Sequence, residues 1–142
     1  MKIDSHHHFW KYDPQTYSWM NQQMDILKVD YQPLDLEREI SAAGIDGVVS
    51  VQADQSLRET DDLLNHARVN DFILGVVGWL PLADANVRDL MDKYSDCSLL
   101  KGIRHVVQDE PDDNFILGEE FNRGVSLLKE YNWAYDILIY ER

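Results

Sequence analysis

Five short strand-like runs recur along the chain and predict β-strands. They cover residues 2–8, 47–53, 72–80, 100–107 and 133–140. The middle three are rich in valine or isoleucine and almost continuously apolar, which is typical of strands that are covered on both faces. The runs therefore favour a parallel sheet over a sheet with one solvated face.

Four amphipathic segments with helical spacing lie between these strands. Pro33 can open the first segment and Gly44 can end it. Ser56 and Glu59 match a capping box at the start of the second, and Asp84 can cap the third. The predicted helices cover 33–44, 56–70, 84–94 and 118–132.

This alternation predicts an α/β fold in which right-handed crossovers join parallel strands. Both a doubly wound open sheet and a TIM-type (βα) barrel fit the pattern. A complete barrel needs at least about 200 residues, so a barrel of about five parallel strands is incomplete. We expect residues 1–142 to form a single domain. The longest irregular connection, 9–32, is expected to hold a short helical piece near 17–23 and to serve or cover a site.

Charge and cysteine content limit the possible binding partners and the cellular compartment of the protein. The net charge is −13, from 26 acidic residues against 13 Lys and Arg, so we expect neither nucleic acid nor anionic membrane as a partner. Cys97 is the only cysteine, which excludes an intrachain disulfide and favours a reducing compartment. We expect no signal peptide, because no long apolar stretch follows Lys2 and Asp4, and no apolar run in the sequence is long enough to span a membrane. The prediction is a cytoplasmic protein.

The opening MKIDSHHHFW contains the strongest candidate for chemistry. Side chains alternate along a strand, so His6 and His8 share one face and their Cα atoms lie about 7 Å apart. Two imidazoles at that spacing can converge on one divalent ion, which lowers the pKa of a bound water. The alternative is a solvent-exposed cluster near a terminus.

Further polar and aromatic candidates stand where the predicted strands end. Gln52 and Trp79 are candidate substrate-binding residues, and Arg104 and His105 are candidate catalytic residues. Arg104 can hold a carboxylate or polarise a carbonyl, while His105 can transfer protons. Strand alternation lets only one of the two point inward, unless a bulge intervenes. The structural alternatives are a salt bridge for Arg104, a loop hydrogen bond for Gln52 and core packing for Trp79.

The connection after the histidines is rich in aromatic residues: Phe9, Trp10, Tyr12, Tyr17 and Trp19. Flat rings suit the apolar face of a sugar-like ring, and Trp10 is the substrate-binding candidate among them. The alternative is that these rings anchor the loop, which we favour for Tyr12 and Tyr17.

Acidic residues near the last two predicted strands are weaker candidates. Asp136 lies within the fifth strand and would need a partner if its charge were buried. The acidic run 109–113 is expected to be a solvated loop.

Four stretches carry a resemblance to a known family. IDSHHHFWKYDPQTYSWM, GVVSVQADQSLRETDDLLNHA, GVVGWLPL and LKGIRHVVQDEP follow one another in the chain and resemble the sugar-lactonase branch of the amidohydrolase-2 family. The resemblance implies a (βα)8 barrel with its site at the C-terminal strand ends. It also implies a divalent metal, commonly zinc, on the His-x-His pair, which maps onto His6 and His8.

The resemblance covers only the N-terminal part of such a barrel. Family members run to about twice this length, and their later strands supply another histidine and an aspartate that have no counterpart here. We therefore expect a truncated chain. The predicted function is hydrolysis of a small lactone by water attack at the ring carbonyl, assisted by a divalent metal.

Two other functions fit the same residues. The chain can be a non-catalytic half-barrel that pairs with a second copy, as a homo-oligomer, or with a missing half, since open strand edges promote association. A related decarboxylase is a further alternative on the same fold.

Overall fold

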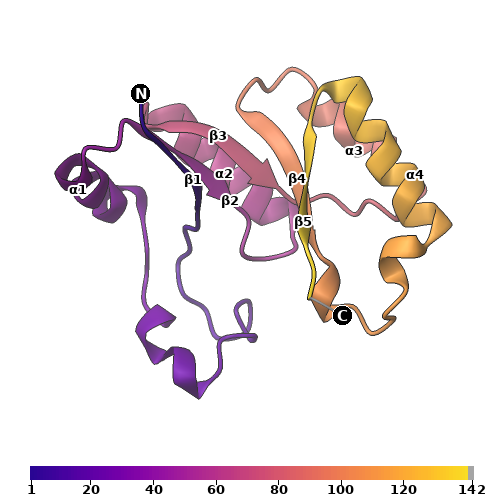
Figure 1. Cartoon of the computed structure of the whole chain (residues 1–142), viewed down its shortest axis with the longest axis horizontal. Helices are drawn as coiled ribbons and strands as arrows, with labels where there is room; N and C mark the ends of the chain where they lie inside the picture. The colour runs from indigo at the N-terminus through magenta and orange to yellow at the C-terminus, as the bar shows by residue number, and fades with distance from the viewer. Residues whose placement is uncertain (141–142) are drawn as a thin grey trace.

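The computed structural model describes residues 1–140, and its centre is a five-stranded parallel sheet (Figure 1). All five predicted strands are present, each within or close to its predicted bounds. The strands follow one another in the order β1-β2-β3-β4-β5. Their bounds are Ile3–His7 (β1), Gly47–Val51 (β2), Ile73–Gly78 (β3), Leu100–Val106 (β4) and Ala134–Leu138 (β5).

Helices cover the outer face of this curled sheet (Figure 1). Sequential strand order with helices on one face distinguishes a half-barrel from a doubly wound sheet, whose strand order reverses and whose helices lie on both faces. The incomplete barrel is therefore confirmed. The α-helices are Pro33–Ala43 (α1), Leu57–Val69 (α2), Val87–Tyr94 (α3) and Glu119–Leu127 (α4), and the 3-10 helices are Gln22–Leu27 (η1), Val107–Asp109 (η2), Phe115–Leu117 (η3) and Leu128–Tyr131 (η4).

The main hydrophobic core lies between the helices and the outer face of the sheet. Val48, Val76 and Ile103 of the strands are fully buried there, together with Leu64 of α2 and Met91 of α3. Because side chains alternate along a strand, the neighbours of these core residues point to the opposite face of the sheet, toward the barrel interior. The paired residues of β4 and β5 keep a regular register, so side chains that face the interior alternate with core residues along both strands.

Local capping explains where the helices begin and end, with two differences from the prediction. Gly44 ends α1 with φ of 64°, a left-handed conformation that glycine adopts at low cost. Ser56 caps α2, but the Glu59 carboxylate accepts from the backbone N–H groups of Ala53 and Asp54, so the predicted capping box is only half formed. The third helix begins at Val87 rather than near 84, because a side-chain turn precedes it.

The connection 9–32 folds around a small core of its own. Trp10, Tyr17 and Met20 are buried together, apart from the main core. The indole Nε1 of Trp10 donates to the carbonyl oxygens of Leu27 and Val29 at 3.1 and 2.8 Å. The helical piece expected near 17–23 lies later, at η1. The connection is thus an ordered unit that projects from the C-terminal end of the sheet (Figure 1).

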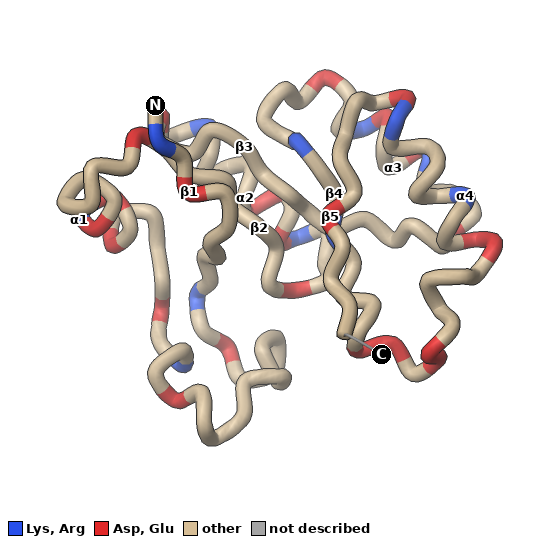
Figure 2. Tube along the Cα trace, viewed as in Figure 1, with Lys and Arg blue, Asp and Glu red and all other residues tan. Residues whose placement is uncertain are grey.

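Acidic residues are spread over the helices and loops, and cations are fewer (Figure 2). The acidic run 109–113 lies beside the C-terminal end of β5, at the same end of the sheet as the connection 9–32. Within residues 1–140, no helix is both long and apolar enough to cross a membrane.

The close contact between α4 and the loop after β3 predicts that replacing a helix glycine by alanine lowers the free energy of unfolding, the opposite of the usual effect. A Cβ atom on Gly124 would lie 1.9 Å from the carbonyl oxygen of Leu82. Alanine normally stabilises a helix by about 1 kcal/mol relative to glycine, but here the overpacking dominates. We expect Gly124→Ala to lower the free energy of unfolding by about 2 kcal/mol or more in urea titrations. Glu120→Ala on the exposed part of α4 is the control, and a stabilised Gly124→Ala variant would contradict the packing.

The buried Glu59 gives a pH dependence of stability. Burial raises the pKa of Glu59 from its ordinary value of 4.5 to about 7, although its two backbone hydrogen bonds oppose the rise. The folded chain then holds this proton more tightly than the unfolded chain, so stability should fall as pH rises from about 5 to about 8, by up to roughly 3 kcal/mol. Glu59→Gln should remove this slope in urea titrations across that range. The exposed Glu37→Gln should keep it, and an unchanged slope in Glu59→Gln would refute the assignment.

Candidate functional site

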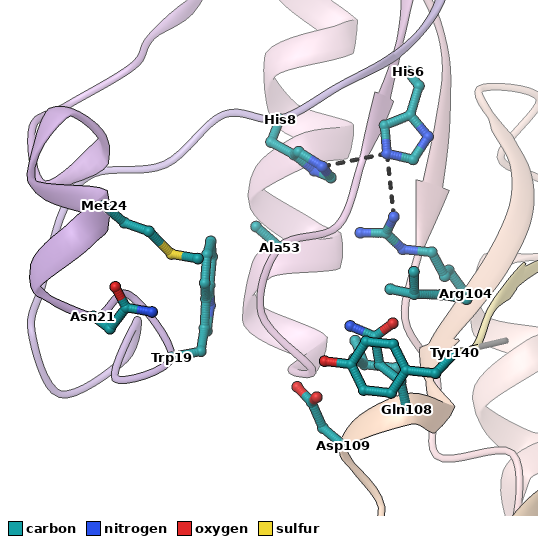
Figure 3. Close-up of a pocket in the computed structure, with 12 residues that line it drawn as sticks. His6, His8, Trp19, Asn21, Met24, Ala53, Arg104, Gln108, Asp109 and Tyr140 are labelled. Atoms are coloured by element: carbon teal, nitrogen blue, oxygen red, sulfur yellow. Dashed lines mark hydrogen bonds between the residues drawn. The ribbon is translucent and has the colours of Figure 1, made fainter. Parts of the chain in front are cut away.

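A cavity of about 540 Å³ opens at the C-terminal ends of the strands (Figure 3). Its lining comes from β1, β4 and β5 and from the loops that follow β1, β2, β4 and β5. This is the end of a (βα) barrel where active sites form. The connection 9–32 supplies the opposite wall. The lining residues are His6, His8, Trp19, Asn21, Met24, Ala53, Arg104, Val106, Gln108, Asp109, Leu138 and Tyr140.

His6 and His8 point into this cavity and toward each other, as strand alternation predicts (Figure 3). Their Nε2 atoms are 3.3 Å apart. The Nδ1 of His8 lies 2.8 Å from the carbonyl oxygen of Val51, and because a carbonyl can only accept, this nitrogen carries the proton. The Nε2 of His8 therefore presents a lone pair to the cavity.

The Nε2 of His6 presents a lone pair as well. It lies 3.2 Å from Nη1 of Arg104, and a guanidinium can only donate. Two lone pairs thus face each other, an arrangement that attracts a cation. Burial lowers the pKa of His8 to about 4, with further lowering from the charges of Arg104 and His6, so the His8 imidazole is neutral at neutral pH.

The donor pair fits zinc as two of its ligands. Zn–N bonds of about 2.0–2.1 Å at a tetrahedral angle place two nitrogens roughly 3.3 Å apart, which matches the observed separation. The hydrogen bond from His8 to a carbonyl is also the usual way in which a ligand histidine is oriented. Among residues 1–140 there is no group of three or more His, Cys, Asp or Glu side chains that could hold a metal ion.

Arg104 and Gln52 join the ends of β2 and β4 across β3. Nη2 of Arg104 donates to the carbonyl oxygen of Gln52, while Nε2 of Gln52 donates back to the carbonyl oxygen of Arg104 at 3.3 Å. Gln52 is fully buried and does not line the cavity. The structure thus places this predicted substrate-binding residue beneath the site, where it positions Arg104.

The guanidinium of Arg104 is a positive charge held in a largely buried place. Desolvation lowers the pKa of Arg104, and the charges of Asp136 and Glu59 oppose the lowering. Asp136 is the register partner of Arg104 on β5, so the two side chains share the interior face. Arg104 therefore meets an acidic neighbour on one side and His6 on the other.

His105 lies on the opposite face of β4 and does not line the cavity. Its Nδ1 accepts from the indole Nε1 of Trp79 at 3.2 Å, and its Nε2 then donates to the Glu110 carboxylate at 2.6 Å. Phe115 stacks on its ring. Of the two neighbouring candidates, only Arg104 thus reaches the cavity, while His105 and Trp79 brace the turn after β4 from the core side.

Trp19 and Tyr140 supply the aromatic rings of the cavity lining, and Trp10 does not. Trp10 is buried in the small core of the connection 9–32 and both its indole bonds go to that loop, so its ring does not reach the cavity. Trp19, in contrast, is 43% exposed and faces the cavity (Figure 3). The sequence could not separate the two, because burial in a loop leaves no periodic signal.

Several polar lining residues were not predicted from the sequence. Asp109 belongs to the acidic run that we expected to be a solvated loop, yet the η2 turn brings it and Gln108 to the cavity. Asn21 caps η1 with its side-chain oxygen and also lines the cavity. Their positions could have indicated this role, because both residues belong to segments that follow strands of a parallel sheet, and such segments form the active-site end of a barrel.

Comparisons with known proteins agree with this geometry. The sequence profile of the Amidohydrolase family matches residues 3–140. The L-fucono-1,5-lactonase of Burkholderia multivorans is 35% identical over 143 residues, which cover 100% of this chain and 48% of that protein. The L-fucono-1,5-lactonase of Burkholderia ambifaria is 28% identical over 141 residues, which cover 99% of this chain and 49% of that protein.

A solved structure gives the same result. The crystal structure of an amidohydrolase from Burkholderia multivorans with bound zinc superposes with a TM-score of 0.93 at 34% identity, over 99% of this chain and 49% of that one. The chain spans about half the length of these relatives. With the family profile matched over nearly all of its residues, the chain belongs to the amidohydrolase family.

Proposed function

We propose that this chain forms part of a cytoplasmic hydrolase that opens a small sugar lactone by attack of water at the ring carbonyl. The observation that carries the proposal is the convergence of His6, His8 and Arg104 in one cavity at the C-terminal strand ends. The relatives named as L-fucono-1,5-lactonases support a lactone as the substrate class. The free thiol of Cys97 is consistent with a reducing compartment.

Arg104 is the residue to which we assign stabilisation of the developing charge. Addition of water to the carbonyl carbon places negative charge on the carbonyl oxygen, and a preorganised cation in a water-poor place stabilises it. The bond between the carbonyl carbon and the ring oxygen then breaks, the ring oxygen takes a proton that the attacking water gives up, and the new carboxyl group releases the remaining water proton to solvent. The product is a hydroxy acid in its carboxylate form.

His6 and His8 are the residues to which we assign a divalent metal, zinc in the first place. When bound, such an ion supplies a water of lowered pKa near the substrate carbonyl. The carbonyl oxygen of Val51 keeps His8 in the tautomer that leaves Nε2 free for it. The zinc in the related crystal structure supports this assignment.

Arg104→Met tests the proposal through two opposite effects. We expect kcat/KM for L-fucono-1,5-lactone to fall by roughly a hundredfold to a thousandfold, because the charge that stabilises the oxyanion is removed. We also expect zinc to bind more tightly in calorimetric titrations, because a cation 3.2 Å from the His6 lone pair competes with the metal. The exposed Arg68→Met is the control. Full turnover in Arg104→Met, or weaker zinc binding, would remove Arg104 from this role.

A second candidate function is pairing of the half-barrel with another copy of the chain. Within residues 1–140, β1 and β5 each have an edge that no strand covers. Ile137 of β5 is 62% exposed and the neighbouring Ile139 is 51% exposed. Apolar side chains along an open strand edge favour association.

Sedimentation equilibrium tests this pairing. We expect a mass of about twice the 16.6 kDa of one chain. Ile137→Lys should shift the protein toward the monomer, because a charge on an open edge disfavours strand pairing. Val69→Lys, at an exposed apolar position at the end of α2, should not shift it. A wild-type monomer at every concentration would exclude a homo-oligomer.

A further inference from the structure

We infer that Trp19 is the platform on which the apolar face of the substrate ring stacks, with the ring hydroxyls directed to Gln108 and Asp109 and the carbonyl to Arg104. This inference deepens the proposed function and rests on it for the identity of the substrate class. It assigns an orientation as well as a set of contacts.

The first step is that Trp19 is exposed yet fixed. Its ring meets the ring of Trp10 edge to face, with centroids 6.5 Å apart and planes at 87°. Trp10 in turn is buried and held by two hydrogen bonds to the same loop. The exposed face of Trp19 is therefore presented to the cavity by a preformed core, which lowers the cost of ordering it on binding.

The second step is that polar groups lie on the facing wall. Gln108 and Asp109 line the cavity across from Trp19, beside Tyr140 (Figure 3), and their side chains can hydrogen-bond a ligand. Asn21 beside Trp19 uses its oxygen for the η1 cap and keeps its N–H groups for a ligand. An aromatic wall opposite hydrogen-bonding groups suits a ring with C–H groups on one face and hydroxyls at its rim.

The third step is that the cavity has a charge direction. Arg104 lies next to His6 at one part of the lining, and Asp109 lies on the η2 turn at another. A carboxylate accepts from hydroxyls but repels a carbonyl oxygen, whereas a guanidinium attracts it. A polyhydroxylated lactone therefore has one favourable orientation, with its carbonyl toward Arg104 and its hydroxyls toward Asp109.

Turnover by a Trp19 variant tests the platform. In the 142-residue chain, Trp19→Ala should lower kcat/KM for L-fucono-1,5-lactone about tenfold, because the C–H face of the ring loses its stacking surface. Trp19→Phe, which keeps a flat ring, should recover most of that loss. Ile26→Ala, an exposed apolar position in the same loop, is the matched control. An unchanged kcat/KM in Trp19→Ala would overturn the inference.

A binding measurement separates this inference from the proposed reaction. L-fucose, which cannot be hydrolysed, should bind in calorimetric titrations and shift the tryptophan emission of the wild type. In Trp19→Phe it should still bind, without the emission change. If no lactone is turned over while L-fucose behaves in this way, the proposed reaction fails and the platform stands. If L-fucose binds the wild type without altering its emission, or does not bind at all, the platform fails.

Discussion

Arg104 holds a buried positive charge at the point where the ends of β1, β2 and β4 meet, and the site is arranged around that charge. One hydrogen bond ties the guanidinium to the carbonyl oxygen of Gln52, and another reaches His6 from a strand nearly a hundred residues earlier. Because an unpaired buried charge is costly, these contacts fix both strand ends relative to β4. The contacts that lower the free-energy cost of burying the Arg104 charge are thus also the contacts that shape the cavity.

The fold could be predicted from the sequence because its main signals are local and repeated. Strand-like runs marked all five strands, and Gly44 and Ser56 marked helix ends that the structure retains. No local sequence signal distinguishes a half-barrel from a doubly wound sheet, because the two folds differ in which faces of the sheet the helices cover. The start of α3 and the place of η1 were missed for a related reason. Side-chain turns at Asp84 and Asn21 decide them, and neither has a hydrophobic period.

The site was predictable where alternation along a strand determines it. His6 and His8 come together for that reason alone. Alternation also required that Arg104 and His105 point apart, but it could not say which of them faces the interior. The structure resolves this through packing: Phe115 and Trp79 enclose His105 on the core side, so Arg104 takes the cavity side. Asp109 escaped prediction because a turn, not a strand, places it.

The acidic character of the chain affects the substrate and the product of the proposed reaction differently. A lactone is neutral, so the net charge of −13 neither attracts nor repels it at a distance. Its hydrolysis product is a carboxylate, which experiences both the general negative field and Asp109 at the cavity wall. Arg104 attracts such an anion, while the charges of Asp136 and Glu59, which oppose the lowering of the Arg104 pKa, act on the same place. The same acidic neighbours that offset the burial of the Arg104 charge therefore also oppose the binding of an anionic product.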